Sequence, residues 1–274
     1  MSSVLLVVHP HRPAAAQLAV TARAWWERQG REVLEVRDLQ RAKPFALGDN
    51  LELAVSLGGD GTMLRTVELA LAARVPVLGV NLGRMGYLTE VEPGGIEDAF
   101  ARVLAHDYVL EERMALSVEV SGSEPGTFVA LNEAIVEKTE PGHTIRVAAE
   151  IAGRPFLTYV ADGLIVCTPT GSTAYNFSAR GPVISPRLRA LVLTPVSPHL
   201  LFDRSLVLEP EEWVRLTVLD GRSAVVVIDG ARLVPLNVGD SVVCRAASEP
   251  ARVISFGGRD FHTVLRARFG LTDR

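Results

Sequence analysis

The sequence predicts a parallel α/β domain followed by an all-β domain, with a C-terminal tail that returns to the first domain. Short apolar runs alternate with helical patterns through the first hundred residues, which is typical of a parallel sheet covered by helices. From about residue 108 to residue 250, short runs of β-forming residues separated by turn residues replace the helical periodicity. A helical pattern returns at residues 261–270. We therefore expect the α/β domain at 1–107 plus about 252–274, and the all-β domain at 108–251.

The elements of the α/β domain are predicted from hydrophobic periodicity and from residues that start or end helices. A continuous apolar run at residues 4–8 predicts a strand buried on both faces. Pro13 and Gly30 delimit an alanine-rich helix, because proline favours the first helical turn and glycine the end. Thr62 is expected to cap a helix that continues to Ala73. The other predicted elements are strands at 32–36, 53–57 and 75–81 and a helix at 96–106.

The all-β domain is predicted from segments rich in β-forming residues, with Ser-Gly, Pro-Gly, Ala-Gly and Asp-Gly turns between them. A helix start is expected to interrupt this pattern at residues 171–180. The strand-like segments are 116–122, 128–138, 144–153, 161–170, 204–210, 213–221, 223–230 and 240–246.

Composition argues against several classes of protein. The chain has 274 residues and a net charge of −4, whereas nucleic-acid binders usually carry a basic excess, so no nucleic-acid partner is expected. Cys167 and Cys244 lie far apart and without metal-ligand spacing, so we expect neither a disulfide nor a zinc site. The N-terminal apolar run is too short to span a bilayer and lacks a basic region before it. We therefore expect no membrane partner and a cytoplasmic location.

A glycine turn, Gly-Gly-Asp-Gly-Thr at residues 58–62, joins a predicted strand to a predicted helix. Glycines let a ligand approach the backbone closely, and the amides at a helix N-terminus favour an anion such as phosphate. We therefore predict a phosphate-donor loop formed by Gly58, Gly59, Gly61 and Thr62. Within it, the Asp60 carboxylate has two sensible roles: it accepts the proton of a substrate hydroxyl, or it holds a metal that bridges phosphates. The alternative, an ordinary Asp-Gly hairpin turn, is disfavoured by the helical pattern that follows.

Three further segments carry candidate binding residues. Residues 168–182 place several hydroxyls beside Tyr175, which suits hydrogen bonds to phosphate and stacking on a base, although simple N-capping explains them equally well. Asn132 and Glu133 are adjacent, so in a regular strand they face opposite sides, and a bulge or a strand end would be needed to direct both to one ligand. Residues 79–90 follow a strand of the α/β domain, where open sheets bind ligands, unless they form only a crossover.

Six segments occur in a fixed order along nearly the whole chain. They are GGDGT at 58–62, GVNLGRMGYLTE at 79–90, LNE at 131–133, ADGLIVCTPTGSTAYNFSARGP at 161–182, LTPVSPH at 193–199 and VVVIDG at 225–230. Together they resemble the NAD kinase family. GGDGT alone also resembles lipid kinases and phosphofructokinases, but the TPTGSTAY and NLGRMGYLTE stretches separate this chain from those relatives.

The resemblance implies phosphoryl transfer from ATP, or from inorganic polyphosphate, to the 2′-hydroxyl of the adenosine ribose of NAD, which gives NADP. It implies a Rossmann-like N-terminal domain, a β-sandwich-like C-terminal domain, and a homodimer or homotetramer. It also implies a divalent metal, usually Mg²⁺, whose protein ligands we leave unassigned.

Individual residues match positions with known roles in the family. Asp60 matches the proposed proton acceptor, and Asp162 matches an aspartate that often reaches the dinucleotide across a subunit interface. Arg65 and His143 fall where some members carry NAD-contacting basic residues. The full set matching NAD-binding positions is Asp60, Gly61, Arg65, Asn132, Glu133, His143, Asp162, Thr173, Ala174, Tyr175, Asn176, Phe177 and Ser178.

Two positions depart from the family's pattern and keep alternatives open. Arg180 stands in Ala-Arg-Gly-Pro where members often have Ala-Gly-Gly-Pro, and Ala231 stands where many have glutamine. One alternative is a kinase of another hydroxyl, such as a lipid kinase, which would need an apolar groove where the polar TPTGSTAY segment lies. The other is a catalytically silent NAD(P)-binding sensor, which would have no need of Asp60 as a base.

Overall fold

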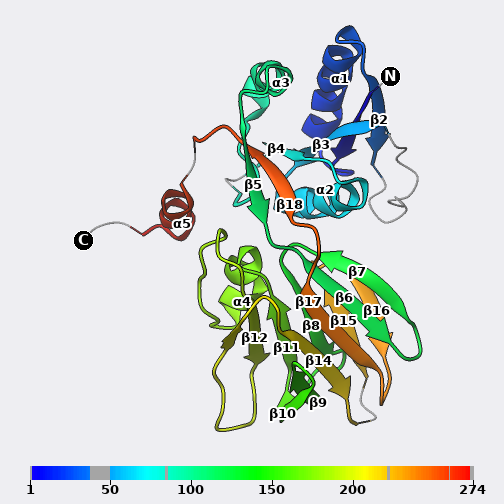
Figure 1. The fold of residues 1–274 in the computed structure, drawn as a ribbon, viewed down its shortest axis with the longest axis vertical. Helices are drawn as coiled ribbons and strands as arrows, with labels where there is room; N and C mark the ends of the chain where they lie inside the picture. The colour runs from blue at the N-terminus through cyan, green and yellow to red at the C-terminus, as the bar shows by residue number, and fades with distance from the viewer. Residues whose placement is uncertain (1, 38–49, 84–85, 221–222, 259, 272–274) are drawn as a thin grey trace. The chain divides into compact units, whose positions relative to one another are not determined.

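The computed structural model describes residues 2–37, 50–83, 86–220, 223–258 and 260–271, and it divides the chain into two compact units (Figure 1). The first unit comprises Met1–Glu112 and Ala251–Arg274, and the second comprises Arg113–Pro250. Residues 84 and 85 of the predicted ligand segment at 79–90 lie outside the described residues. The predicted division at 107/108 precedes strand β5 (Val109–Arg113), which joins the sheet of the first unit.

The first unit is built on a six-stranded sheet with the order β2-β1-β3-β4-β18-β5. β1 runs parallel to β2 and to β3, and β4 runs parallel to β3 and to β18, so the predicted parallel α/β domain is confirmed. Every residue of β1 is buried, as expected for a strand covered on both faces. β5 and β18 are strands that periodicity did not predict. The other strands are β1 (Ser3–Val8), β2 (Glu32–Val36), β3 (Leu51–Gly58), β4 (Val77–Asn81) and β18 (Ala251–Ser255).

Helices cover both faces of this sheet (Figure 1). α1 (Pro13–Arg28) and α3 (Ile96–Leu104) share a hydrophobic core with one face, where the rings of Trp26 and Phe100 pack with centroids 5.0 Å apart. α2 (Asp60–Ala73) packs against β1, β3 and β4 with buried residues that are not part of that core, so it covers the other face.

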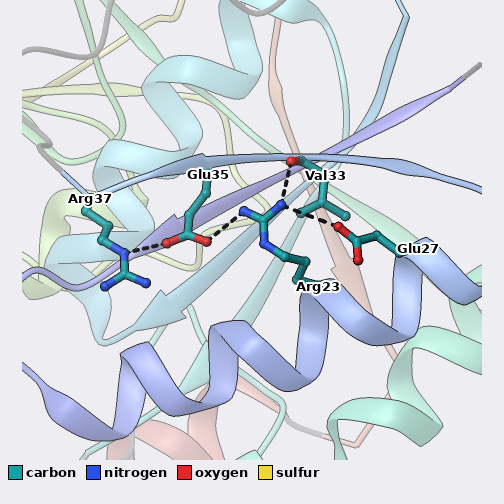
Figure 2. A network of polar contacts seen from close by, with 5 residues as sticks. All are labelled: Arg23, Glu27, Val33, Glu35 and Arg37. Atoms are coloured by element: carbon teal, nitrogen blue, oxygen red, sulfur yellow. Dashed lines mark hydrogen bonds and ion pairs between the residues drawn. The ribbon is translucent and has the colours of Figure 1, made fainter.

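A polar network joins α1 to the edge strand β2 (Figure 2). Arg23 donates to a Glu35 oxygen at 2.8 Å and to the Val33 carbonyl at 3.1 Å, and it pairs with Glu27 at 3.6 Å. Arg37 donates to the other oxygen of Glu35. Because these side chains are partly exposed, each pair contributes at most about 1 kcal/mol, and the network orients α1 on β2 more than it stabilises the fold.

The C-terminal tail belongs to the first unit, as predicted. β18 lies between β4 and β5, and the chain continues into α5 (Phe261–Phe269). Asp260 caps α5 by accepting hydrogen bonds from the amides of His262 and Thr263 at 3.0 and 3.2 Å. Gly270, with φ of +60°, ends the helix in the left-handed conformation that glycine favours. Among the described helices, none has the length and apolar character needed to cross a membrane.

The second unit consists of two six-stranded antiparallel sheets with the orders β10-β9-β14-β17-β6-β7 and β13-β12-β11-β8-β15-β16. Both sheets contribute to one hydrophobic core, which confirms the β-sandwich-like domain. The strands are β6 (Leu116–Ser121), β7 (Gly126–Ala130), β8 (Glu133–Lys138), β9 (Ile145–Ile151), β10 (Arg154–Ala161), β11 (Gly163–Cys167), β12 (Leu191–Val196), β13 (Leu206–Leu208), β14 (Trp213–Val218), β15 (Ala224–Ile228), β16 (Arg232–Leu236) and β17 (Ser241–Ala246).

Two details of this unit differ from the simplest interpretation of the sequence. The strand-like run at 128–138 is broken at Leu131 and Asn132, so it forms β7 and β8 rather than one strand. The helix start expected at 171–180 is present, but as a 3-10 turn at Thr170–Thr173 followed by the single-turn helix α4 (Tyr175–Ser178). The break and this helical segment contribute the polar residues of the candidate site in this unit.

Candidate functional site

The glycine turn lies at the carboxyl edge of the parallel sheet, where β3 ends at Gly58 and α2 begins at Asp60. Open α/β sheets bind ligands at this edge. The expectation that Thr62 caps the helix is wrong, because Gly59 occupies the N-cap position and Thr62 already lies in the first helical turn. Thr62 is instead 2% exposed, and its Oγ1 has no hydrogen-bond partner among the described residues.

The glycines of this turn have two different structural roles. A Cβ built on Gly58 would lie 2.2 Å from Thr62 Oγ1, so only glycine leaves room for that side chain. A Cβ on Gly59 or Gly61 would meet no other atom within 4 Å. The backbone at these two positions is therefore open to a ligand, beside helix-terminal amides that favour an anion.

The Asp60 carboxylate is held in place by the loop after β4. Oδ2 accepts the Tyr87 amide at 3.1 Å, and Oδ1 accepts the Leu88 amide at 3.2 Å. A Cβ on Gly86 would lie 2.1 Å from Oδ1, so this loop approaches the carboxylate as closely as glycine permits. Arg268 of α5 lies 3.7 Å from Oδ2, and the Asp60 side chain keeps 27% of its surface exposed. The loop after β4 thus does more than cross to the next element: it orients Asp60.

In the second unit, one carboxylate determines the break between β7 and β8. Asp229, in the turn after β15, accepts hydrogen bonds from the amides of Leu131, Asn132 and Glu133 at 2.7, 2.9 and 3.1 Å. Asn132 therefore precedes β8 rather than lying within a regular strand, and this is the strand end that the adjacent Asn-Glu pair required.

The TPTGST segment packs directly on this break. The Thr168 amide donates to the Asn132 carbonyl at 2.9 Å, and its hydroxyl donates to the Leu131 carbonyl at 2.6 Å. A Cβ on Gly171 would lie 2.1 Å from the Asn132 oxygen, so glycine is required for this close approach. The Tyr175 amide is close enough to the Glu133 carboxyl group to lower the pKa of that group, so α4 also lies near β8.

The predicted binding residues at 173–178 divide into buried and exposed positions. Asn176 is fully buried: its Nδ2 donates to the Ser172 and Pro182 carbonyls at 3.1 and 3.0 Å, and its Oδ1 accepts the Thr194 hydroxyl at 2.7 Å. Its side chain therefore supports the segment from inside. Tyr175 and Phe177 are 39% and 40% exposed, Ser178 is exposed, and Thr173 and Ala174 are half-buried.

Two buried carboxyl groups give this site unusual acid–base properties. Burial, and secondarily the Asp229 charge, raise the pKa of Glu133 to about 8, despite the stabilising Tyr175 amide. Burial raises the pKa of Asp229 to about 6, and its three amide donors oppose that shift. Glu133 therefore binds a proton at neutral pH, while Asp229 is mainly ionised.

Asp162 lies at the other end of β8 from Glu133. Its carboxylate pairs with Lys138 at 2.6 Å, and the register of β8 with β11 sets Glu137 opposite Gly163 but Glu133 opposite Cys167. That separation of four residues is roughly 13 Å along a strand. The pKa of Tyr175 is raised by burial and then by the Glu137, Asp162 and Glu133 charges, so its hydroxyl is within electrostatic reach of both ends.

The two predicted basic contacts have different environments. Arg65 is 7% exposed in α2 of the first unit and forms an ion pair with Glu68 on the same helix. His143 is exposed on the turn between β8 and β9 of the second unit. The structure thus gathers Asp60 with the glycine turn in one unit, and Asn132, Glu133 and residues 173–178 in the other.

Comparison with known proteins decides the family. Residues 36–108 match the ATP-NAD kinase N-terminal domain, and residues 131–256 match the ATP-NAD kinase C-terminal domain. The NAD kinase of Heliobacterium modesticaldum is 43% identical over 98% of this chain and 98% of its own length. The NAD kinase of Wolinella succinogenes is 37% identical over 100% of this chain and 97% of its own.

The chain belongs to the NAD kinase family.

Solved structures agree in fold with this member of the NAD kinase family. An NAD kinase from Archaeoglobus fulgidus in complex with ATP superposes with a TM-score of 0.76 at 26% identity, covering 98% of both chains. Yeast NADH kinase complexed with NADH superposes with a TM-score of 0.83 over 100% of this chain and 89% of its own. At 20% identity, the second comparison concerns the fold alone.

Several residues that build the site were not among those predicted from the NAD kinase family's motifs. Asp229 had a signal, since an Asp-Gly turn closes the VVVIDG segment, but nothing in the sequence paired it with residues 131–133. Arg268 had no signal at all, because a basic residue near a helix C-terminus usually interacts with the helix dipole. The amides of Tyr87 and Leu88 are backbone groups, whose role is independent of residue type.

The two departures from the family's pattern lie in turns. Arg180 is exposed and has φ of +63°, in the left-handed region where glycine is favoured, and its amide donates to the Phe177 carbonyl at 3.0 Å. Ala231 is exposed, and its amide closes the β15–β16 turn on the Ile228 carbonyl at 3.0 Å. A glycine at position 180 would therefore relieve backbone strain.

The variant Glu133→Gln should change how stability depends on pH. Because the folded-state pKa of Glu133 is raised from 4.5 to about 8, its favourable contribution is complete below pH 4.5 and is lost as the pH rises to about 8. Glutamine stays neutral, so the free energy of unfolding of the variant should rise relative to that of the wild type between pH 5 and pH 8, by roughly 3–4 kcal/mol. Urea unfolding at several pH values measures the difference, with Glu140→Gln on an exposed turn as the control. A difference that does not vary with pH would contradict the assignment.

The variant Arg180→Gly should be more stable than the wild type. Glycine adopts φ of +63° without a Cβ penalty, and the expected gain in the free energy of unfolding is about 0.5–1 kcal/mol after the larger unfolded-state entropy of glycine is included. Arg180→Ala, which removes the charge but keeps the strain, should stay within about 0.5 kcal/mol of the wild type. Denaturant unfolding followed by circular dichroism compares the three proteins. Equal stability of the glycine and alanine variants would refute the strain argument.

Proposed function

We propose that the protein transfers the γ-phosphoryl group of ATP to the 2′-hydroxyl of the adenosine ribose of NAD, with Asp60 as the proton acceptor. The observation that carries this proposal is the Asp60 carboxylate, oriented by two backbone amides beside an open glycine turn at the start of α2. The placement suits a base that must meet both a hydroxyl and a phosphate. Family membership supports the same substrate pair.

The phosphate side of the reaction is supported by the glycine turn. A Cβ on Gly59 or Gly61 would meet no atom within 4 Å, so a ligand can approach the backbone there, and the α2 dipole favours negative charge at this point. Thr62 Oγ1, buried and without a partner among the described residues, is a further donor beside the turn. Phosphoryl transfer depends mainly on positioning and charge neutralisation, and these groups supply both.

Asp60 supports the hydroxyl side. A ribose hydroxyl is a weak nucleophile at neutral pH, and a positioned carboxylate that takes up its proton typically contributes about 10²–10⁴ in rate. The Tyr87 and Leu88 amides hold the two oxygens, so little orientation has to be gained when substrate binds.

Mg²⁺ is the metal that we propose for this reaction. Among the described residues, no group of three or more His, Cys, Asp or Glu side chains converges. The metal would therefore take most of its ligands from the substrate phosphates and water, as Mg²⁺ commonly does. The single exposed carboxylate of Asp60 beside the glycine turn is compatible with that mode. When bound, Mg²⁺ would neutralise charge on the donor phosphates.

The dinucleotide is proposed to bind residues of the second unit. Tyr175 and Phe177 offer exposed rings for stacking, and Asn132 stands at the strand end fixed by Asp229. With a pKa of about 8, Glu133 is a carboxylic acid at neutral pH, so it can donate a hydrogen bond to a ribose or carboxamide oxygen. By family resemblance, Asp162, Thr173, Ala174 and Ser178 are also proposed to contact the dinucleotide. Asn176 instead supports the segment from inside.

The alternatives rank below this proposal. Full-length similarity to NAD kinases favours NAD over a lipid hydroxyl as the acceptor. A silent sensor would not require the oriented carboxylate of Asp60. ATP is the preferred donor because the matching family is named for it and the Archaeoglobus fulgidus relative binds ATP, while polyphosphate stays an untested second donor. The homodimer or homotetramer and the cytoplasmic location also stay predictions.

The proposal is tested by NADP formation. Purified protein is incubated with NAD, ATP and Mg²⁺, and an NADP-specific dehydrogenase reports the product. We expect NADP to form with ATP. Its formation should stop when EDTA removes the metal and should resume when Mg²⁺ is added back in excess. A parallel reaction with polyphosphate defines the donor. Folded protein that binds NAD but forms no NADP with either donor would favour the silent sensor.

The variant Asp60→Asn should keep the fold and lose activity. Asparagine retains an oxygen for one loop amide but cannot accept a proton, so kcat should fall by about 10² or more. Asp98→Asn is the matched control, because Asp98 is also an acidic residue in the first turn of a helix of the same unit. The control should stay within about twofold of the wild type. Turnover by Asp60→Asn at the rate of the control would rule out the proton-acceptor role.

A further inference from the structure

The C-terminal helix α5 brings an arginine to the predicted proton acceptor. Arg268 Nη1 lies 3.7 Å from Asp60 Oδ2, and the Arg268 guanidinium lies 4.9 Å from the centroid of the Tyr87 ring. Tyr87 is the residue whose amide donates to the same Asp60 oxygen. The guanidinium is therefore positioned by the carboxylate and by the loop that orients that carboxylate.

The tail has other attachments to the first unit. The Glu90 carboxylate, in the loop after β4, accepts the amides of Phe256 and Gly258 at 3.1 and 3.0 Å. Val264 of α5 is 6% exposed, and Asp260 caps the helix. These contacts attach the tail to the first unit without Arg268. The position of Arg268 beside Asp60 is therefore not explained by a need to anchor the tail.

The charges at this point favour a cation. Asp60 is the proposed base, and the donor phosphates are proposed to bind at the adjacent glycine turn, so negative charges would meet there. A guanidinium is permanently charged and its planar group of N–H donors suits carboxylate and phosphate oxygens. Arginine beside the transferring phosphoryl group is a recurring device for neutralising charge in phosphoryl transfer.

We propose that Arg268 is a positioning residue of the phosphoryl-transfer site, which holds the Asp60 carboxylate in place and sets a positive charge beside the bound donor phosphates. This inference rests on the proposed function. It makes α5 a part of the site rather than a terminal appendage.

The test compares three full-length variants with the wild type in NADP formation at varied NAD and ATP. Arg268→Gln should lower kcat about tenfold or more while the KM for NAD changes less than about threefold, because a positioning role is expressed after substrate binding. Arg268→Lys, which keeps the charge without the planar group, should recover part of the loss. Arg266→Gln is the control, since it removes one arginine from the same helix, and should stay within about twofold of the wild type.

Thermal unfolding and NAD binding without ATP are measured on every variant, so that kcat refers to folded protein. If Arg268→Gln does not fold, Tyr87→Leu replaces it, because that variant keeps the backbone amide to Asp60 and removes the ring beneath the guanidinium. It should lower kcat with little change in the KM for NAD.

The outcomes separate this inference from the proposed function. NADP formation by the wild type with no more effect of Arg268→Gln than of Arg266→Gln would overturn the role of Arg268 and leave the function standing. No recovery by Arg268→Lys would overturn the part of the inference that sets a positive charge beside the donor phosphates, because lysine keeps that charge. A wild type that forms no NADP would overturn the proposed function, and this inference with it.

Discussion

The candidate residues of each unit depend on the same interaction, in which a carboxylate accepts hydrogen bonds from backbone amides at the end of a strand. A loop that follows a strand leaves amides without ladder partners, and buried amides need acceptors. Asp60 fills that need for the loop after β4, and Asp229 fills it for the turn between β7 and β8. In each case one side chain fixes the backbone of a segment distant in sequence.

The two carboxylates differ in whether their oxygens stay accessible to a ligand. Asp60 keeps part of its surface open to solvent beside the glycine turn, so it can meet a substrate. Asp229 uses its oxygens on three amides in a buried setting, so its effect on a ligand is exerted through Asn132 and Glu133. Burial, and secondarily the negative charge of Asp229, raises the pKa of Glu133. A single buried aspartate thus fixes the backbone of residues 131–133 and adds to the effect of burial on the protonation of Glu133.

Sequence alone predicted much of the fold, because the apolar runs of β1, β3 and β4 and the periodicity of α1 and α3 are local signals. It did not predict β18 as a strand of the first sheet, since its place depends on pairing with β4, from which the whole second unit separates it in the chain.

The candidate site shows the same limit. The motifs located Asp60, Glu133 and Tyr175, whereas the contacts of Asp229 with residues 131–133 and of Arg268 with Asp60 arise from tertiary structure. Asn176 shows the converse: a residue inside the most specific motif has its side chain wholly occupied with internal hydrogen bonds. A motif identifies a segment of a site, but burial decides which of its side chains face a ligand.

The position of β18 in the first sheet has a consequence for synthesis of the chain. Residues 113–250 form a complete unit with its own core, whereas the first sheet lacks an inner strand until residues 251–255 are made. Since domains generally fold as units during synthesis, the unit encoded second is complete while the first still has unpaired edges on β4 and β5. The first unit, which carries the glycine turn, can therefore complete its sheet only at the end of synthesis, and a chain that stopped before residue 251 would lack an inner strand together with α5.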